Sequence, residues 1–237
     1  MSGSLSEEIA IAAARMIVED GMEYGPAKRR AAKLLGFGTR AHELPDNEQL
    51  EEEVRLHLAL FCAESQPQEL AALRAVAVAW MERLAEFRPH LTGAVWRGTA
   101  TRLSDVRIEL FCDDSKATEL RLLDQRVPYD VATATGPRGK PVDVLSVSSP
   151  CPALGEPVTV HLTVLDYDDL RGALKGDSRG RAQRGDLQAL RELATAASAP
   201  VAAFSPAPPS TQAPPATPAP PFMPARSSKP APGGSEG

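Results

Sequence analysis

Charged residues at the start of a strand-like segment are the first candidates for chemistry. Asp105 and Arg107 are two positions apart in a stretch that alternates charged and apolar side chains, and Glu109 continues the alternation. Residues two apart on a strand point to the same face. Two carboxylates in this arrangement could hold Mg²⁺ for phosphoryl transfer. Here the second position is an arginine, which stays protonated and repels a metal ion.

A longer pattern surrounds this segment and covers residues 91–147. Gly93 is followed by Arg97-Gly98-Thr99-Ala100, then by Ser104-Asp105, and later by Gly139-Lys140-Pro141-Val142-Asp143. The pattern resembles the small bacterial nucleotidyltransferases. In that family a strand ends in Gly-Ser, an Arg-Gly-x-Ala loop follows, the next strand begins Ser-Asp-x-Asp, and a third acid comes later. The resemblance implies a nucleotidyltransferase-like core.

The resemblance also assigns roles to residues of this chain. It makes Asp105 and Asp143 the catalytic and metal-binding carboxylates, and Asp130 competes with Asp143 for the role of third acid. The residues that would bind the nucleotide phosphates lie in one loop: Gly93, Ala94, Arg97 and Gly98. Mg²⁺ is the cofactor if the protein is active, and otherwise no cofactor is expected.

Two positions depart from the family pattern, and both concern the reaction. Ala94 replaces the serine whose hydroxyl would contact phosphate, and Arg107 replaces the second aspartate. We expect Arg107 to pair with Asp105 or Glu109 on the same strand face. The preferred interpretation is therefore a catalytically degenerate member that binds a nucleotide or a partner. An active Mg²⁺-dependent nucleotidyltransferase and a pure protein-interaction module are the alternatives.

A second resemblance covers the folded part of the chain as a whole. Leu44-Pro45-Asp46-Asn47-Glu48, residues 94–101 and Asp169-Leu170-Arg171-Gly172-Ala173-Leu174 are similar to a family of small bacterial proteins often labelled UDP-N-acetylmuramate–alanine ligase. Such ligases resemble three-domain proteins with an ATP loop ending in Gly-Lys-Ser or Gly-Lys-Thr. This chain has no such loop and is too short for three domains, so the ligase reading is a disfavoured alternative.

The composition of the chain indicates which partners and which cell compartment to expect. The net charge of −5 does not favour a nucleic-acid binder, which is usually basic. No apolar stretch is long enough to span a membrane, and residues 1–8 do not read as a signal peptide. The cysteines are odd in number and scattered, as expected for reduced thiols in the cytoplasm: Cys62, Cys112 and Cys151.

Apolar periodicity and punctuating residues predict an α+β fold with a mixed β-sheet core. The expected helices cover residues 5–20, 26–35, 46–62, 67–88, 115–125 and 186–197, and the expected strands cover 106–110, 129–133, 142–147 and 158–165. We divide the chain into a helical N-terminal region, 1–88, a nucleotidyltransferase-like core, 89–198, and a disordered Pro- and Ala-rich tail, 199–237. The tail could offer a Pro-rich segment to a protein partner.

Three further signals are read as structural. Gly136-Pro137-Arg138-Gly139-Lys140-Pro141 predicts a turn between strands rather than a phosphate loop. The four histidines are isolated, and no Ser/His/Asp arrangement is expected around His161 or elsewhere. A run of basic residues is read as a solvated loop, with phosphate binding as the alternative: Arg171, Lys175, Arg179, Arg181 and Arg184.

Overall fold

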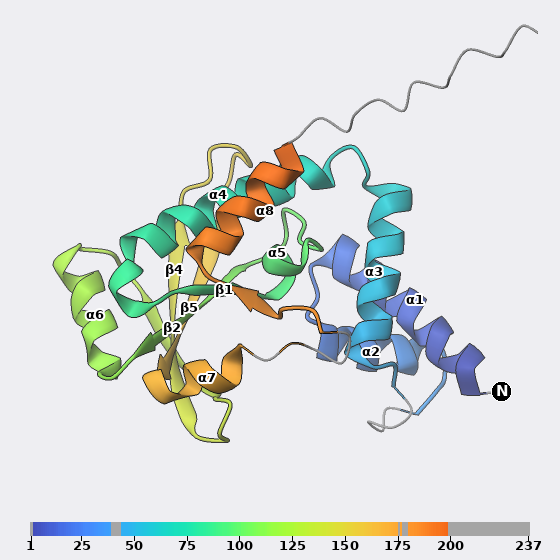
Figure 1. The fold of residues 1–237 in the computed structure, drawn as a ribbon. Coiled ribbons are helices and arrows are strands. Elements are labelled where there is room, and N and C mark those ends of the chain that lie inside the picture. The colour runs from blue at the N-terminus through green and yellow to red at the C-terminus, as the bar shows by residue number, and fades with distance from the viewer. Residues whose placement is uncertain (1, 39–43, 175, 177–179, 199–237) are drawn as a thin grey trace, which may run out of the picture. The chain divides into compact units, whose positions relative to one another are not determined.

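Three helices form the first part of the chain in a computed structural model that describes residues 2–38, 44–174, 176 and 180–198 (Figure 1). They are α1 (Ser2–Asp20), α2 (Tyr24–Leu34) and α3 (Asn47–Phe61). Their buried side chains form one hydrophobic cluster, in which small alanines on α1 and α2 let the helices approach closely. The expected helices in this region are thus confirmed. The expected tail, residues 199–237, lies outside the described residues.

The helix boundaries follow from the capping residues that the sequence contains. Gly21 ends α1 with a φ of 67°, a left-handed conformation that favours glycine. Asp46 caps α3 by accepting a hydrogen bond from Gln49 N at 2.7 Å, as expected. Within the described residues, the Gln49 side chain does not bond back to Asp46 N, so the two residues do not form a capping box. Gln49 instead accepts a bond from Ser6 Oγ at 2.9 Å, which joins α1 to α3.

The remaining helices and the strands form the second part of the described chain. The helices are α4 (Gln66–Arg83), η2 (Ala85–Phe87), α5 (Gly93–Arg97), α6 (Ser115–Asp124), η3 (Tyr167–Asp169), α7 (Leu170–Ala173) and α8 (Leu187–Ser198). The strands are β1 (His90–Thr92), β2 (Val106–Cys112), β3 (Asp130–Thr135), β4 (Pro141–Ser149), β5 (Val158–Asp166) and β6 (Arg184–Gly185). The predicted α+β class and mixed sheet are therefore confirmed. None of the helices in the described ranges is long and apolar enough to cross a membrane.

The six-stranded sheet has the order β3-β4-β5-β2-β1-β6. Only β2 and β5 are parallel, and the other neighbours are antiparallel. The turn between β3 and β4 is the predicted one, with Gly136 N donating to Lys140 O at 2.8 Å. Periodicity did not predict β6, because two residues are too few to show an alternation.

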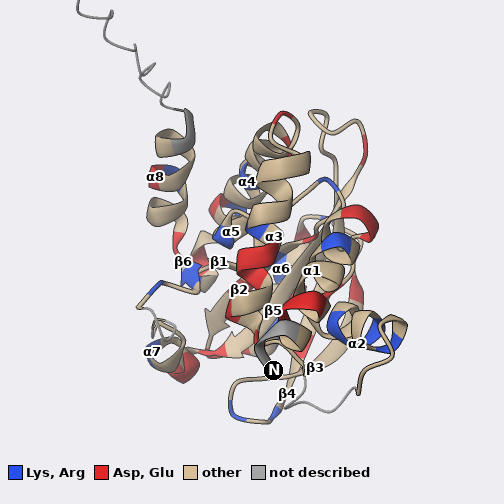
Figure 2. Ribbon diagram, turned by 90° about the vertical axis from the view of Figure 1, so that its right-hand side faces the viewer, with Lys and Arg blue, Asp and Glu red and all other residues tan. Residues whose placement is uncertain are grey.

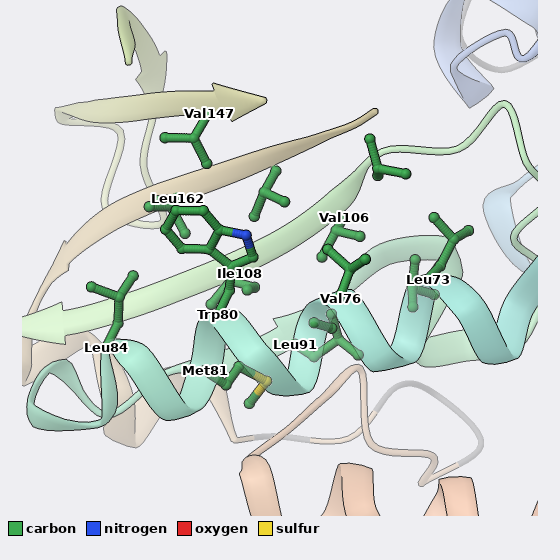
Figure 3. Close-up of a cluster of buried hydrophobic side chains, with 14 of the residues drawn as sticks. Leu73, Val76, Trp80, Met81, Leu84, Leu91, Val106, Ile108, Val147 and Leu162 are labelled. Carbon is green, nitrogen blue, oxygen red and sulfur yellow. The ribbon is translucent and has the colours of Figure 1, made fainter. Parts of the chain in front are cut away.

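Helices α4 and α8 lie side by side over one face of the sheet (Figure 1). Trp80 of α4 projects toward the strands that carry Ile108 and Leu162 (Figure 3), and its Nε1 donates to Ser149 Oγ at 2.9 Å. Because α4 packs in this sheet-based core and not with α1 to α3, the two hydrophobic clusters divide before α4. The domain boundary drawn after residue 88 stays a prediction.

The other face of the sheet carries a row of polar side chains, because directly paired residues share a face. We call the following residues, from β6 to β3, the polar row: Arg184, Thr92, Arg107, His161, Ser146 and Asp130. The face that the sequence identified from Asp105 and Arg107 is therefore the face away from α4 and α8.

Gly185 lets β6 approach α5, and we expect Gly185→Ala to destabilise the protein. A Cβ at Gly185 would lie 2.0 Å from Trp96 Cη2, and Trp96 is held by a hydrogen bond from its Nε1 to Ala182 O at 2.7 Å. Overpacking of this kind costs about 2 kcal/mol. Urea denaturation measures the loss. Gly172→Ala is the control, since its Cβ meets nothing within 4 Å; equal midpoints for the two variants would contradict the prediction.

Candidate functional site

A cavity of about 400 Å³ lies between the turn from α1 to α2 and the face of the sheet that carries the polar row. We call it the Gly93 pocket. Its lining contains Gly93, Ala94, Arg97, Asp105 and Arg107, all of which the sequence singled out. Gly98 and Asp143 are not part of the lining. The structure therefore gathers most of the predicted phosphate-binding residues around one cavity.

Two glycines shape the segment beside the pocket. Gly93 starts α5 with a φ of 72°, and a Cβ there would lie 3.4 Å from Arg107 Cδ. The stem of Arg107 thus lies against the Gly93 turn. Gly98 ends α5 in a left-handed conformation, with its N–H bonded to Ala94 O, and a Cβ there would approach Arg74. Gly98 is a helix terminator and does not contact the cavity.

A short turn brings Asp105 to the pocket. Ser104 Oγ accepts a hydrogen bond from Thr101 N at 3.0 Å, and Ser104 N donates to Thr101 O at 2.9 Å. The serine of the Ser-Asp pair therefore closes the turn that leads into β2. This local bonding directs Asp105 and then Arg107 onto the polar face.

Each arginine of the pocket is paired with an acid from another element. Arg107 pairs with Glu23, which precedes α2, and Arg184 of β6 pairs with Glu109 of β2. The expectation that Arg107 pairs with Asp105 or Glu109 is therefore wrong. Glu109 pairs with Arg184 instead, because β6 lies two strands from β2 in the sheet. The sequence did not reveal that these strands are close. The reading of the basic run as a solvated loop is likewise wrong for Arg184.

The third arginine, Arg97, belongs to a cluster on the buried carboxylate of Glu51. Glu51 of α3 is 7% exposed, and its oxygens lie 2.7 Å from Arg55 Nη2 and 3.0 Å from Arg97 Nε. Arg181 Nη1 lies 3.9 Å away. Acidic residues of α3 lie near basic residues of α5 in Figure 2. Glu51 therefore links the helical part of the chain to the pocket. Lys175 and Arg179 of the basic run lie outside the described residues.

Four buried side-chain atoms have no hydrogen-bond partner within the described ranges, and all four belong to residues that line the pocket: Tyr24 Oη, Arg97 Nε, Thr99 Oγ1 and Arg184 Nε. Thr99 is only 3% exposed. Arg97 Nε is close to Glu51 but is not aligned for a hydrogen bond to it. Buried polar atoms are costly unless they are bonded. Because all four unpartnered atoms belong to residues around one cavity, we interpret the cavity as a site for a polar ligand.

Asp143 does not join Asp105, because strand register separates the two residues. Asp105 precedes Val106 by one residue and so aligns with Thr159, which pairs with Ser148. Asp143 is five residues from Ser148, roughly 16 Å along the strand. It also shares the face of Leu145, which is buried in the core on the other side of the sheet. The two carboxylates that the resemblance assigned to one metal site thus lie on opposite faces.

Asp130 does not supply the missing acid either. It belongs to the polar row with Arg107 but lies three strands away, roughly 14 Å at about 4.8 Å per strand. No group of three or more metal-ligating side chains occurs in the described part of the chain. Arg107, and not a second carboxylate, stands two residues after Asp105 in the chain. The residues present therefore do not fit a Mg²⁺ pair at this pocket.

The structure instead assembles a hydrogen-bonded series that the sequence missed. Ser146 Oγ lies 2.9 Å from His161 Nδ1, and His161 Nε2 lies 3.2 Å from Asp105 Oδ2. An ionised carboxylate only accepts, so Nε2 donates to Asp105; when the ring carries its proton on Nε2 alone, Nδ1 accepts from the Ser146 hydroxyl. The expectation of no Ser/His/Asp arrangement is wrong. The three residues come from β4, β5 and the start of β2, and only strand register brings them together.

The chemistry of the pocket thus consists of arginine and hydroxyl donors around Gly93 and one carboxylate held by a histidine. The comparisons with known proteins add no family to this description. The sequence matches no protein-family model and no curated protein.

Proposed function

We propose that the protein is a nucleotidyltransferase-like binding module whose Gly93 pocket takes the phosphate groups of a nucleotide without turning it over. The observation that carries this proposal is the gathering of unpartnered buried polar atoms and arginines around one cavity. Phosphate oxygens accept hydrogen bonds, and Arg97 Nε, Arg184 Nε and the Thr99 hydroxyl can all donate them. The cavity volume of about 400 Å³ falls in the range of small-molecule sites.

Arg107 is the arginine that a phosphate can recruit at the lowest cost. Its partner Glu23 is 61% exposed, and Arg107 itself is 44% exposed. Exposed ion pairs contribute only about 0–1 kcal/mol, so an incoming phosphate can replace Glu23 as the partner of Arg107. The pairs of Arg97 and Arg184 are more buried and would stay in place.

We propose binding without turnover because the pocket lacks the residues that phosphoryl transfer would need. Phosphoryl transfer needs cations that neutralise the phosphates and orient the attacking group. The position two residues after Asp105, where a second carboxylate would stand, holds Arg107. A fixed arginine can neutralise phosphate, which favours binding, but it cannot hold an attacking hydroxyl as a metal does. We therefore expect binding that does not depend on Mg²⁺.

Calorimetric titration with ATP and with GTP, in Mg²⁺ and in EDTA, tests the proposal. We expect saturable binding that persists in EDTA. Thr99→Val should weaken it about tenfold or more, because a hydrogen bond to a charged group is lost while the shape is kept. Thr118→Val, in α6 and not part of the pocket lining, is the matched control and should bind like the wild type.

Three outcomes would count against this function. Mg²⁺-dependent transfer of a nucleotide by the wild type would show an active enzyme. Nucleotide binding gained only in Arg107→Asp would mean that Arg107 blocks the pocket instead of serving it. No binding in either protein would leave a protein-interaction role as the better explanation.

That interaction role is the second candidate, and exposed apolar side chains favour it. Ile11 of α1, Leu35 at the end of α2 and Phe61 of α3 are 51%, 40% and 72% exposed, and all three line one open hollow. Large apolar side chains gathered at a surface mark interaction sites more often than isolated ones do. Sedimentation over a range of concentrations, with Phe61→Ser beside the wild type, would detect self-association through these helices.

A further inference from the structure

We infer that Asp105, held by His161 and Ser146, accepts a hydrogen bond from a hydroxyl group of the ligand, so that the pocket selects a phosphorylated sugar over a bare polyphosphate. This inference rests on the proposed function. It assigns a specificity-determining role to Asp105 and a positioning role to His161.

The carboxylate of Asp105 differs from the other carboxylates that line the pocket. Glu23 and Glu109 are paired with Arg107 and Arg184, whose charges compensate them. The printed partner of Asp105 is His161, and no arginine or lysine of the described residues forms an ion pair with Asp105. Asp105 therefore has no permanent cation paired with it, at the edge of a pocket that is otherwise supplied with donors.

A negative charge in that place favours a ligand that brings its own donor. Phosphate oxygens carry charge and accept hydrogen bonds, so a bare polyphosphate would be repelled by Asp105. A sugar hydroxyl can donate to the carboxylate while the phosphates bind the arginines. Asp105 Oδ2 accepts from His161, and Oδ1 accepts no hydrogen bond from the described residues. Oδ1 is the acceptor that we assign to the ligand.

The hydrogen-bonded series orients this acceptor. Ser146 donates to His161 Nδ1, which leaves the Nε2 proton directed at Asp105. Ser146 and His161 are paired across β4 and β5, so two central strands of the sheet fix the imidazole. Rigid strands position a site residue more closely than a loop does. His161 thus fixes Asp105 Oδ2 by a hydrogen bond, which leaves Oδ1 available to a ligand in the pocket.

The same series does not form a nucleophilic site. Asp130 is paired with Ser146 across β3 and β4, so its carboxylate would oppose an oxyanion that developed at Ser146. Neither Ser146 nor His161 lines the Gly93 pocket. Their role is to position Asp105, and not to react.

Calorimetry with three probes in EDTA tests the inference: ATP, 2′,3′-dideoxy-ATP and inorganic tripolyphosphate. We expect the wild type to bind ATP about tenfold or more tightly than the dideoxy analogue, since a hydrogen bond to a charged group is at stake. Asp105→Asn should reduce that preference several-fold and tighten tripolyphosphate binding. Thermal unfolding of Asp105→Asn shows whether the variant is folded.

Two substitutions at His161 separate positioning from mere packing. His161→Gln keeps an N–H donor near Asp105 and should retain much of the preference for ATP. His161→Phe fills the space without a donor and should lose the preference while tripolyphosphate still binds. Equal effects of the two variants would contradict the positioning role.

The outcomes distinguish the inference from the function on which it rests. If ATP, its dideoxy analogue and tripolyphosphate bind with equal affinity, hydroxyl selection is refuted and the phosphate pocket stands. If none of the three binds, both proposals fall.

Discussion

Replacing Glu51 with glutamine should lower the free energy of unfolding by about 3 kcal/mol, the cost of breaking a buried ion pair on one side. Glu51 is 7% exposed, and its carboxylate oxygens lie 2.7 Å from Arg55 Nη2 and 3.0 Å from Arg97 Nε. Glutamine keeps the shape but removes the charge, so Arg97 would remain largely buried beside a neutral amide. Its guanidinium cannot lose its proton to relieve the cost.

Urea denaturation of Glu51→Gln measures this effect, and Glu82→Gln is the matched control. Glu82 pairs with Arg191 at the surface, where both side chains are about half exposed. An exposed pair contributes about 0–1 kcal/mol, so the control should unfold close to the wild type. Similar losses in both variants would show that the cluster around Glu51 is no stronger than an ordinary surface pair. Salt should reduce the Glu82 effect more than the Glu51 effect.

Arg184→Met should destabilise the protein by about 3 kcal/mol near pH 8 and by much less near pH 5. Arg184 and Glu109 are each 19% exposed at their side chains, so the substitution leaves a largely buried carboxylate without its cation. Burial raises the pKa of Glu109, and the charge and hydrogen bond of Arg184 act against that rise. Without Arg184 the pKa of Glu109 rises further.

The sign of the pH dependence follows from this raised pKa. In the unfolded chain Glu109 ionises at its ordinary value, while in the folded variant it holds its proton to a higher pH. The folded state then binds more protons in the interval between the two values, so stability decreases as the pH rises through it. Below the ordinary value both states are protonated and the penalty of the substitution is smallest.

Denaturation of Arg184→Met at several pH values checks the prediction, with Glu109→Gln/Arg184→Met as the control. The double variant has no charge at either position and should show no such pH dependence. A loss of stability in Arg184→Met that is the same near pH 5 and near pH 8 would contradict the account.

Glu51→Gln and Arg184→Met also test the pocket, because Glu51 and Arg184 form ion pairs with residues that line it. Glu51 connects α3 to Arg97 at the end of α5, and Arg184 connects β6 to β2. Loss of either contact should weaken ligand binding together with stability. Thr99→Val, in contrast, removes a buried hydroxyl that has no partner among the described residues, and should weaken binding without lowering stability. Arg184 is also a proposed donor to phosphate, so it is the comparison of Glu51→Gln with Thr99→Val that separates the framework of the pocket from its contacts with a ligand.

Local signals in the sequence predicted most of the longer elements. Asp46 marks the start of α3, Gly21 marks the end of α1, and Asp114 caps α6 by accepting from Lys116 N at 2.9 Å. These signals are readable because a cap acts on backbone groups within a few residues of itself. The alternation in β2 is readable for the same reason, since it depends on one strand with one buried face.

The pairing of the strands could not be predicted from the sequence. The order and register of the sheet place β5 beside β2 and Asp143 far from Asp105, and no single segment contains that information. A one-residue change of register would reverse the face of every side chain on a strand. The predicted metal pair failed for this reason, and the series from Ser146 to Asp105 was missed for the same reason.

The sequence by itself determined the fold class, most of the helices and strands, and the identity of residues such as Gly93, Asp105 and Arg107 that line one cavity. It also contained the substitution at Arg107 that argues against a metal pair. Only the tertiary structure decided which polar side chains meet: Arg107 with Glu23, Arg184 with Glu109, and Asp105 with His161. The physical reason is that periodicity and capping are local, whereas ion pairs and hydrogen-bonded series depend on contacts between segments far apart in the chain.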